Sequence, residues 1–196
     1  MILPDYGTYL HGDVAVERKY LIRSKLVELA DLRKPSDILD IGCGRGLIAI
    51  AFALNSPRHR VHAMDVWNQN EIADNSPDWV LHNAQLEGVD NVVVSRGDAR
   101  NIPCEAGAFD VVVSNLVIHN LPHKDQFQAF SEMKRALKPG GLLLYSDLDI
   151  GGQFQRAGDS LSALGFQETR LHRLVTFPRE PPVSIFALMA VKPPEV

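Results

Sequence analysis

The sequence predicts a single α/β domain over residues 1–196, a three-layer sandwich in which helices cover both faces of a largely parallel sheet. Strand-like runs alternate with helical segments from residue 37 onward, as expected for strand–helix–strand units. The continuous valine run within 109–115 suits a strand that is covered on both faces. The last two strand-like runs are joined by only "PREPP", so we expect them to be antiparallel neighbours.

Composition places the chain among globular proteins. It has 196 residues, 45% of them hydrophobic and 22% charged, and no linker or repeat divides it. A net charge of −4 gives no overall positive field, so we expect no nucleic-acid partner and no anionic-lipid partner. The first residues do not resemble a signal peptide, and the longest apolar run, 47–54, is too short to span a bilayer. We therefore expect a cytoplasmic protein without a membrane segment.

The first elements alternate between helix and strand. Residues 13–32 mix polar and apolar positions at helical spacing and end before Pro35, which favours a helix. Residues 37–41, "DILDI", predict a short apolar strand. Residues 47–56 are apolar on most sides and predict a buried helix. Residues 60–65, "RVHAMD", alternate in polarity and predict a second strand that ends in an acid.

The middle of the chain repeats this alternation. Residues 76–88 begin with Ser-Pro and stop at glycine, so both boundaries of a helix are present. Residues 91–99, "NVVVSRGDA", predict the third strand, and the valine-rich run 109–115, "FDVVVSN", predicts the fourth.

The last part of the chain contains two helices and three strands. Residues 124–141 predict a helix followed by a Pro-Gly-Gly stop, and 141–147, "GLLLYSD", predict the fifth strand. A short helix is expected around 154–164. The runs 166–177 and 183–192 form the terminal antiparallel hairpin, in which the first run is expected to be parallel to the earlier strands.

Three glycines alternate with Cys43 and Arg45 directly after the first strand, in "ILDIGCGRG" (38–46). In a doubly wound sheet, ligands bind beyond the carboxyl ends of the strands, and glycine there lets a ligand approach the main chain. Dinucleotide-binding proteins use G-x-G-x-x-G, but the third position here is Leu47, and no Gly-Lys-Ser/Thr of a P-loop follows. Taken alone, the loop is a weak signal, and a tight turn of structural importance only is the alternative interpretation.

Polar residues also end the neighbouring strands. Asp65 lies about 20 residues past the glycines, where an acid can accept both hydroxyls of a ribose. Asp98 follows the third strand, Asn115 ends the fourth, and Asp40 precedes the glycine loop. These acids suit a ribose-bearing ligand that also carries a cationic group, and nothing in the pattern requires a pyrophosphate.

With these residues in place, the chain resembles the class I S-adenosylmethionine-dependent methyltransferases, most of all their small-molecule branch of types 11 and 25. The resemblance covers residues 37–147 in the family's order and spacing. It implies a Rossmann-like, seven-stranded sheet in the order 3-2-1-4-5-7-6 with the last strand antiparallel. The matching motifs are "LDIGCGRG" (39–46), "VHAMD" (61–65), "RGDARNIPCEAGAFDVVVSN" (96–115) and "RALKPGGLLLYSD" (135–147).

The resemblance also implies the cofactor, S-adenosyl-L-methionine, and the positions that bind it. Its methionine part would contact Asp40, Gly42, Gly44 and Gly46. Its ribose would contact Asp65, its adenine Val66 or Trp67 with Asp98 and Ala99 at the edge, and its sulfonium Asn115 and Leu116.

Methyl transfer from a sulfonium is an in-line displacement, so most of the catalysis is positioning and desolvation. A general base matters only where the acceptor must lose a proton. His119, a few residues past the fourth strand, is the candidate base, and packing within the loop is the alternative interpretation. His123 is expected at the start of the next helix.

Candidate substrate-binding residues lie in the segments that vary most in this architecture. Tyr6, Tyr9 and His11 belong to the N-terminal segment 1–12, which in relatives often covers the pocket, although such a terminus can also be frayed. Arg179 and Glu180 lie in the turn of the terminal hairpin, which is either a solvated turn or a substrate contact. The sequence indicates a small-molecule acceptor with an O, N or S nucleophile and does not identify it.

Motif differences argue against several other branches of the methyltransferase family. "SNLV" departs from the Asn-Pro-Pro-Tyr type motif of DNA methylators, and Asn115 stands where metal-dependent relatives carry an acid, so no metal is expected. Cys43 is expected to be a packed residue and not a nucleophile. A nicotinamide-dependent oxidoreductase and a non-catalytic S-adenosylmethionine-binding regulatory module remain as alternatives. The sequence does not indicate the oligomeric state.

Overall fold

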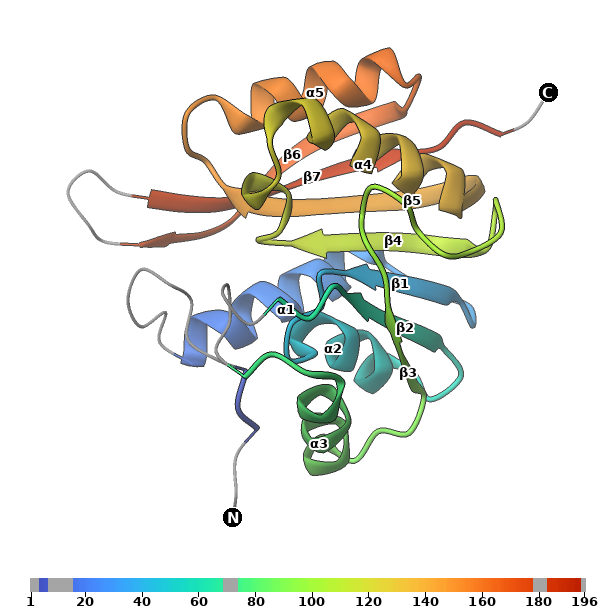
Figure 1. Ribbon diagram of the computed structural model, residues 1–196, viewed down its shortest axis with the longest axis vertical. Coiled ribbons are helices and arrows are strands. Elements are labelled where there is room, and N and C mark those ends of the chain that lie inside the picture. Colours follow the sequence, from blue (N-terminus) through green and yellow to red (C-terminus); the bar gives the residue numbers. More distant parts are fainter. Residues whose placement is uncertain (1–3, 7–15, 69–73, 178–182, 195–196) are drawn as a thin grey trace. The chain divides into compact units, whose positions relative to one another are not determined.

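The computed structural model describes residues 4–6, 16–68, 74–177 and 183–194 of the chain (Figure 1). Seven strands among these residues form a sheet in the order β3-β2-β1-β4-β5-β7-β6, and β7 is antiparallel to both of its neighbours. This order and the antiparallel last strand confirm the predicted fold. The chain divides into two compact units, residues 1–98 and 99–196, which are described in turn.

The first unit is a three-stranded parallel sheet with helices packed on it (Figure 1). Helix α2 packs on β1 and β2 and also contacts α1 and α3. Its first seven residues, 47–53, are all buried, because this helix is apolar on every side, as the sequence predicted. The elements are α1 (Val16–Ala30), β1 (Asp37–Ile41), α2 (Leu47–Asn55), β2 (Arg60–Asp65), α3 (Pro77–Glu87) and β3 (Val92–Arg96).

The described part of the second unit, residues 99–177 and 183–194, holds four strands and two α-helices. Strands β4 and β5 are parallel, β7 pairs antiparallel with β5, and β6 lies outside β7, so β6 has the direction of β5, as predicted. The elements are β4 (Phe109–Asn115), the 3₁₀ turn η1 (Ile118–Asn120), α4 (His123–Ala136), β5 (Leu137–Leu148), α5 (Gln153–Ala163), β6 (Gln167–Phe177) and β7 (Val183–Val191).

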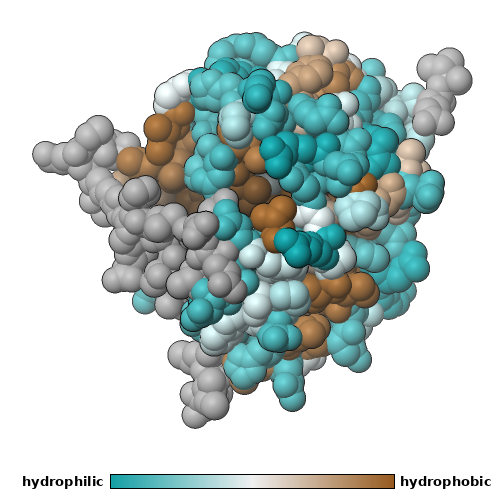
Figure 2. Space-filling view, in the orientation of Figure 1, coloured by the Kyte–Doolittle hydropathy of each residue, from teal (hydrophilic) through white to brown (hydrophobic). Residues whose placement is uncertain are grey.

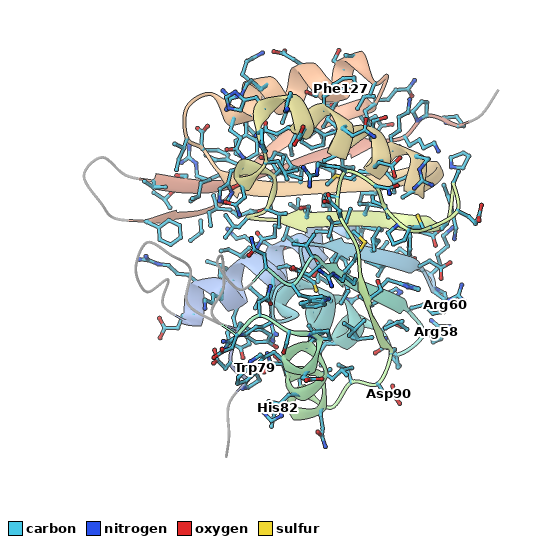
Figure 3. All side chains as sticks on the ribbon, viewed as in Figure 1. Arg58, Arg60, Trp79, His82, Asp90 and Phe127 are labelled. Atoms are coloured by element: carbon cyan, nitrogen blue, oxygen red, sulfur yellow. The ribbon has the colours of Figure 1, made fainter. Side chains whose placement is uncertain are left out.

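Buried apolar side chains of the strands and helices form the core of each unit. In the second unit, the valines of β4 and Leu137, Leu143 and Leu144 of β5 are almost fully buried. The outer surface over α4 and α5 is largely hydrophilic, with isolated apolar side chains such as Phe127 of α4 (Figures 2 and 3). Each described helix is too short or too polar to cross a membrane.

Strand β5 differs most from the prediction, because it begins at Leu137 and not at residue 141. Helix α4 already ends at Ala136, and the Pro-Gly-Gly sequence of residues 139–141 lies within β5 and does not end its strand pairing. Gly140 takes a φ of 74° and donates its N–H to the carbonyl of Lys192, and pairing with β4 shifts register between Phe109 and Val111. A Cβ on Gly141 would lie 2.8 Å from the Lys138 carbonyl oxygen, so glycine is needed at this irregularity.

Parallel pairing aligns the carboxyl ends of the strands within each unit. In the first unit, Ile41 pairs with Met64 and Asp65 pairs with Arg96, while Figure 3 shows Arg60 at the opposite end of β2. In the second unit, Asn115 at the end of β4 pairs with Ser146 of β5. The polar residues singled out in the sequence therefore lie at the ends of strands where loops begin.

Gly46 provides a test of how tightly the glycine loop is packed. It has a φ of 89°, and a Cβ there would lie 3.0 Å from Ile50 Cδ1 and 3.0 Å from Val80 Cγ1, both fully buried. Gly88 is the matched control, because its φ of 72° is similar but nothing lies within 4 Å of a Cβ. Gly46→Ala should lower the free energy of unfolding more than Gly88→Ala, by about 1–3 kcal/mol from overpacking.

Urea unfolding of the two variants measures this difference. Equal losses would contradict the packing role of Gly46 and would leave only its backbone conformation to explain the glycine.

Candidate functional site

The glycine loop, residues 42–46, has its three glycines in the left-handed region, with φ values of 70°, 52° and 89°. The N–H groups of Gly42 and Cys43 both donate to the carbonyl oxygen of Met64, at 2.8 and 3.1 Å. The loop is thus hydrogen-bonded to the end of β2, and side chains at the three glycine positions would be strained.

Asp65 links this loop to the segment after β2. Its Oδ2 accepts the N–H of Gly44 at 2.9 Å, and its Oδ1 accepts the N–H of Trp67 at 2.8 Å. The residue is only 7% exposed. Because each carboxylate oxygen can accept more than one hydrogen bond, Asp65 retains capacity for ligand hydroxyls.

Asp40 is a second buried carboxylate beside the loop. It is 1% exposed, and its Oδ2 accepts the N–H of Ala49, in the first turn of α2, at 2.9 Å. Burial raises the pKa of Asp40 to about 7; the Ala49 N–H lowers it and the Asp65 carboxylate raises it. The N-terminus of α2 therefore donates to a buried acid, whereas the corresponding helix N-terminus of dinucleotide-binding proteins holds pyrophosphate.

Arg45 is held away from these carboxylates by α3 and by residues 4–6. Its guanidinium lies 4.3 Å from the ring centroid of Trp79 and forms an ion pair with Asp5. Asn83 donates from Nδ2 to the carbonyl oxygens of both Arg45 and Asp5, at 2.9 and 2.8 Å. Figure 3 shows Trp79 on α3, the helix that anchors this side of the loop.

Two predicted cofactor residues have strained backbones. Trp67 and Leu116, each just past the carboxyl end of a strand, both have a φ of 59°. This conformation costs about 1–3 kcal/mol for a bulky residue and concentrates at functional sites. Val66, between Asp65 and Trp67, is 40% exposed.

Two buried polar atoms, one in each unit, lack hydrogen-bond partners among the described residues. They are Nε1 of Trp67 and Oδ1 of Asn115. An unsatisfied buried donor or acceptor costs about 1–3 kcal/mol, and a ligand that supplies the missing bond removes this cost. Within the first unit, the Trp67 donor and the carboxylates of Asp40 and Asp65 fit a polar, ribose-bearing cofactor.

Asp98 and Ala99 follow β3. Ala99 is buried and Asp98 is half-buried, and their predicted contacts with adenine remain predictions. The Gly97 N–H just before them donates to the carbonyl oxygen of Asp65 at 3.0 Å, which connects the ends of β2 and β3.

His119 lies in η1, directly after β4, in hydrogen-bond contact with the end of β5. Its Nδ1 is 2.7 Å from Oδ1 of Asp147, a carboxylate that is completely buried. From the sequence, Asp147 was not predicted to contact His119. The contact follows from strand pairing, because Asn115 at the end of β4 pairs with Ser146 of β5 and the turn after Asn115 therefore lies near Asp147.

The predicted substrate residues fall into two groups. Tyr9, His11, Arg179 and Glu180 lie outside the described residues. Tyr6 is buried, donates its hydroxyl to Glu87 and accepts from Arg23, so its polar atom is engaged by α1 and α3. These contacts support anchoring of the N-terminal segment and give no support to a substrate contact by Tyr6. His123 begins α4, as predicted.

Cys43 is buried, and burial raises the pKa of its thiol well above the usual range. Since the thiolate is the nucleophilic form, this direction agrees with the expectation that Cys43 is a packed residue.

The raised pKa of Asp40 predicts a specific dependence of stability on pH. Between about pH 4 and pH 7 the folded chain holds a proton that the unfolded chain releases, so this group makes stability fall as pH rises. Asp40→Asn keeps an acceptor for Ala49 and removes the titration. Its stability relative to the unmodified chain should rise by about 1–4 kcal/mol from pH 4 to pH 8.

Urea unfolding at several pH values measures this difference, with Asp37→Asn at the other end of β1 as control. A constant difference for Asp40→Asn across the range would show that the carboxyl titrates normally.

Comparison with known proteins adds the family. A family model, Methyltransferase domain, matches residues 38–141, more than half of the chain. A malonyl-[acyl-carrier protein] O-methyltransferase from Methylovorus sp. (strain MP688) is 32% identical over 147 residues, which are 72% of this chain and 46% of that protein. A demethylmenaquinone methyltransferase from Staphylococcus aureus (strain JH9) is 28% identical over 69% of this chain and 52% of that protein. The chain thus spans about half the length of the curated relatives it matches.

Among solved structures, a phosphoethanolamine N-methyltransferase 2 from Haemonchus contortus, in complex with S-adenosyl-L-methionine, shares the fold. Its TM-score is 0.69 at 19% identity, over 96% of this chain and 55% of that chain. The strand order, the glycine loop with an acid after the second strand, and the match over residues 38–141 agree: the chain belongs to the methyltransferase domain family.

Proposed function

We propose that this protein binds S-adenosyl-L-methionine and transfers its methyl group, by in-line displacement, to an O, N or S nucleophile of a small molecule. The observation that carries the proposal is the pair of buried carboxylates, Asp40 and Asp65, on either side of the glycine loop. They make the surroundings of this loop acidic, although a glycine-rich loop before a helix is elsewhere a phosphate site.

The charge of the ligand separates the two cofactor classes that the sequence left open. S-adenosylmethionine carries a sulfonium and an ammonium group, whereas a dinucleotide presents a pyrophosphate at the same place in the fold. The Ala49 N–H at the start of α2 already donates to Asp40, so a phosphate would meet a carboxylate there. A cationic ligand is therefore favoured over a dinucleotide.

The geometry of the first unit supports a set of proposed cofactor contacts. Asp65 is proposed to accept the two ribose hydroxyls, since it is fixed by two backbone N–H groups and has acceptor capacity left. The methionine part is assigned to Asp40 and the three loop glycines, and the adenine to Val66, Trp67, Asp98 and Ala99. The unpartnered Nε1 of Trp67 supports a polar contact with the ligand.

Asn115 and Leu116 are proposed to contact the sulfonium end of the cofactor. The unpartnered, buried Oδ1 of Asn115 is an acceptor that suits a positively polarised group, and the strained φ of Leu116 supports a functional position.

When bound, S-adenosylmethionine supplies an electrophilic methyl carbon on a sulfur leaving group. The residues of this chain then act by orienting the reactants and excluding water, which accounts for most of the rate in such a displacement. The matched O-methyltransferase and demethylmenaquinone methyltransferase support a small acceptor or a carrier-bound acyl group.

Titration calorimetry tests the cofactor class. The unmodified chain should bind S-adenosylmethionine and S-adenosylhomocysteine and should not bind NAD. Asp65→Asn removes a charged acceptor of several hydrogen bonds, each worth about 1.5–3 kcal/mol, so the affinity should fall about 10- to 100-fold.

Asp37→Asn is the matched control, because Asp37 lies at the opposite end of the same sheet and pairs with Arg60. It should bind like the unmodified chain. Binding of NAD with no response to S-adenosylmethionine would overturn the proposal, and an unchanged affinity of Asp65→Asn would overturn the assignment of the ribose site.

A further inference from the structure

A chain of hydrogen bonds stands behind His119 in the second unit. Nδ1 of His119 lies 2.7 Å from Oδ1 of Asp147, and the Tyr145 hydroxyl donates to Oδ2 of Asp147 at 3.2 Å. Gln153, at the start of α5, donates from Nε2 to the Tyr145 oxygen. A continuous series of side-chain hydrogen bonds thus runs from α5 through β5 to the imidazole in η1.

The donors around Asp147 fix the direction of these bonds. Its carboxylate also accepts the N–H of Leu148 at 2.8 Å, and the His119 N–H lies 3.4 Å from Oδ2. Gln153 Nε2 can only donate, so the Tyr145 oxygen accepts there and turns its own proton towards Asp147. Burial raises the pKa of Tyr145, and Asp147 raises it further, so the hydroxyl keeps that proton.

This arrangement selects one tautomer of His119. An acceptor-only carboxylate next to Nδ1 requires Nδ1 to carry the hydrogen, which leaves the lone pair of the neutral ring on Nε2. The imidazole side chain is 34% exposed, whereas Asp147 is 0% exposed. A partly exposed imidazole with a buried carboxylate behind it is the arrangement by which hydrolases activate a hydroxyl.

The turn that carries His119 is itself held in place. Gln126 of α4 is buried and donates to the carbonyl oxygens of Ile118 and Leu121, on either side of His119, at 3.2 and 3.1 Å. The Leu116 N–H donates to the carbonyl oxygen of Ser146 at 2.8 Å. The imidazole therefore sits on a fixed turn, three residues after the strained Leu116.

We infer that His119 is a general base for a hydroxyl acceptor, and that Asp147, Tyr145 and Gln153 are its positioning residues; this inference rests on the proposed function. The acceptor oxygen forms the new bond to the methyl carbon as the carbon–sulfur bond breaks and its electron pair stays on sulfur. The hydroxyl proton passes to Nε2 of His119, and Asp147 stabilises the imidazolium until the proton returns to water.

The chemistry of the alternatives identifies a hydroxyl as the acceptor. A carboxylate reaches the site already ionised, and a neutral amine attacks through its lone pair. A thiol ionises on its own close to neutral pH. An amine is protonated at neutral pH and must lose that proton before it can act as a nucleophile, whereas a hydroxyl loses its proton during the attack itself. The hydroxyl is therefore the acceptor for which a His–Asp pair at the reacting atom raises the rate of the methyl transfer step.

Charged and titratable groups of several elements act on the His119 imidazole, directly or through a neighbour. Asp147 of β5 contacts the imidazole, Tyr145 of β5 donates to Asp147, and Arg156 of α5 acts electrostatically on Tyr145. Gln126 is the uncharged contact from α4. Removing the Asp147 charge should therefore lower the pKa of His119. Removing the Tyr145 hydroxyl should raise the pKa of His119, because the Asp147 carboxylate then no longer shares its negative charge with that hydrogen-bond donor.

Nitrogen NMR of the histidine rings tests the pair without any cofactor. In the unmodified chain, neutral His119 should carry its hydrogen on Nδ1. Its titration midpoint should fall by about one pH unit or more in Asp147→Asn and rise in Tyr145→Phe, which keeps the ring contacts with Phe130 and Phe154. An Nε2–H tautomer, or a midpoint unmoved by both variants, would overturn the inference.

Kinetics separate a base from a merely structural histidine. A collection of phenols, alcohols, amines, thiols and carboxylic acids is incubated with S-adenosylmethionine, and release of S-adenosylhomocysteine is measured. Hydroxyl compounds should be methylated, and His119→Gln and Asp147→Asn should lose about 10²-fold or more in rate. The acidic limb of kcat/KM should match the NMR midpoint and move with it in Tyr145→Phe.

Two further outcomes are decisive. His123→Gln, an exposed position at the start of α4, is the control and should retain activity. Methylation confined to amines, thiols or carboxylates, or absent from every hydroxyl compound, would overturn the inference, as would a kinetic limb that ignores the NMR midpoint. If calorimetry shows S-adenosylmethionine binding in these cases, the proposed function survives and only the base is lost.

Discussion

The hydrogen bond from the Gly44 N–H to the Asp65 carboxylate is the contact on which the first unit's site depends. It joins the loop after β1 to the acid after β2, and the same carboxylate holds the N–H of Trp67. Gly44 can present its N–H in this direction because its φ is 52°, a conformation that glycine adopts without strain. The positions of Gly44 and Asp65 in the sequence therefore matter because the fold brings this N–H and this carboxylate into one hydrogen bond.

The second unit uses a buried carboxylate at a strand end for a different purpose. Asp65 and Asp147 both accept backbone N–H groups from the residues that follow them. Among the described residues, backbone N–H groups and the Asn75 amide donate to Asp65, so its remaining acceptor capacity suits ligand hydroxyls. Asp147 is surrounded by an imidazole and a phenol, which makes it part of a proton-handling pair. The hydrogen-bond partners of each carboxylate therefore determine its proposed role, which is ligand binding for Asp65 and positioning of His119 for Asp147.

Local sequence patterns were sufficient for most of the fold. The bounds of β2 and β4 were predicted to the residue, because each apolar run ends in a polar side chain, and Gly88 marked the end of α3 with a φ of 72°. Strand β5 was predicted four residues short, because pairing around Pro139 depends on contacts with Lys192, far along the chain. A local Pro-Gly-Gly pattern does not contain information about a contact with a residue so distant in the sequence.

The site was predictable only where it depends on one strand end at a time. Asp65 and Asn115 could be identified from their own segments. The partnership of His119 with Asp147 depends on which strand lies beside β4 and on a side-chain rotamer, and neither is a property of a single segment. The anchoring of Tyr6 by Glu87 and Arg23 is likewise a contact between distant segments.

A crystal structure of the protein grown with S-adenosylhomocysteine would show whether Asp65 and the glycine loop bind the cofactor. We expect both ribose hydroxyls within hydrogen-bond distance of the Asp65 carboxylate and the amino-acid part against the glycines of residues 42–46. A ligand bound elsewhere on the chain, or a ribose that leaves Asp65 in contact only with Gly44, Trp67 and Asn75, would contradict this expectation.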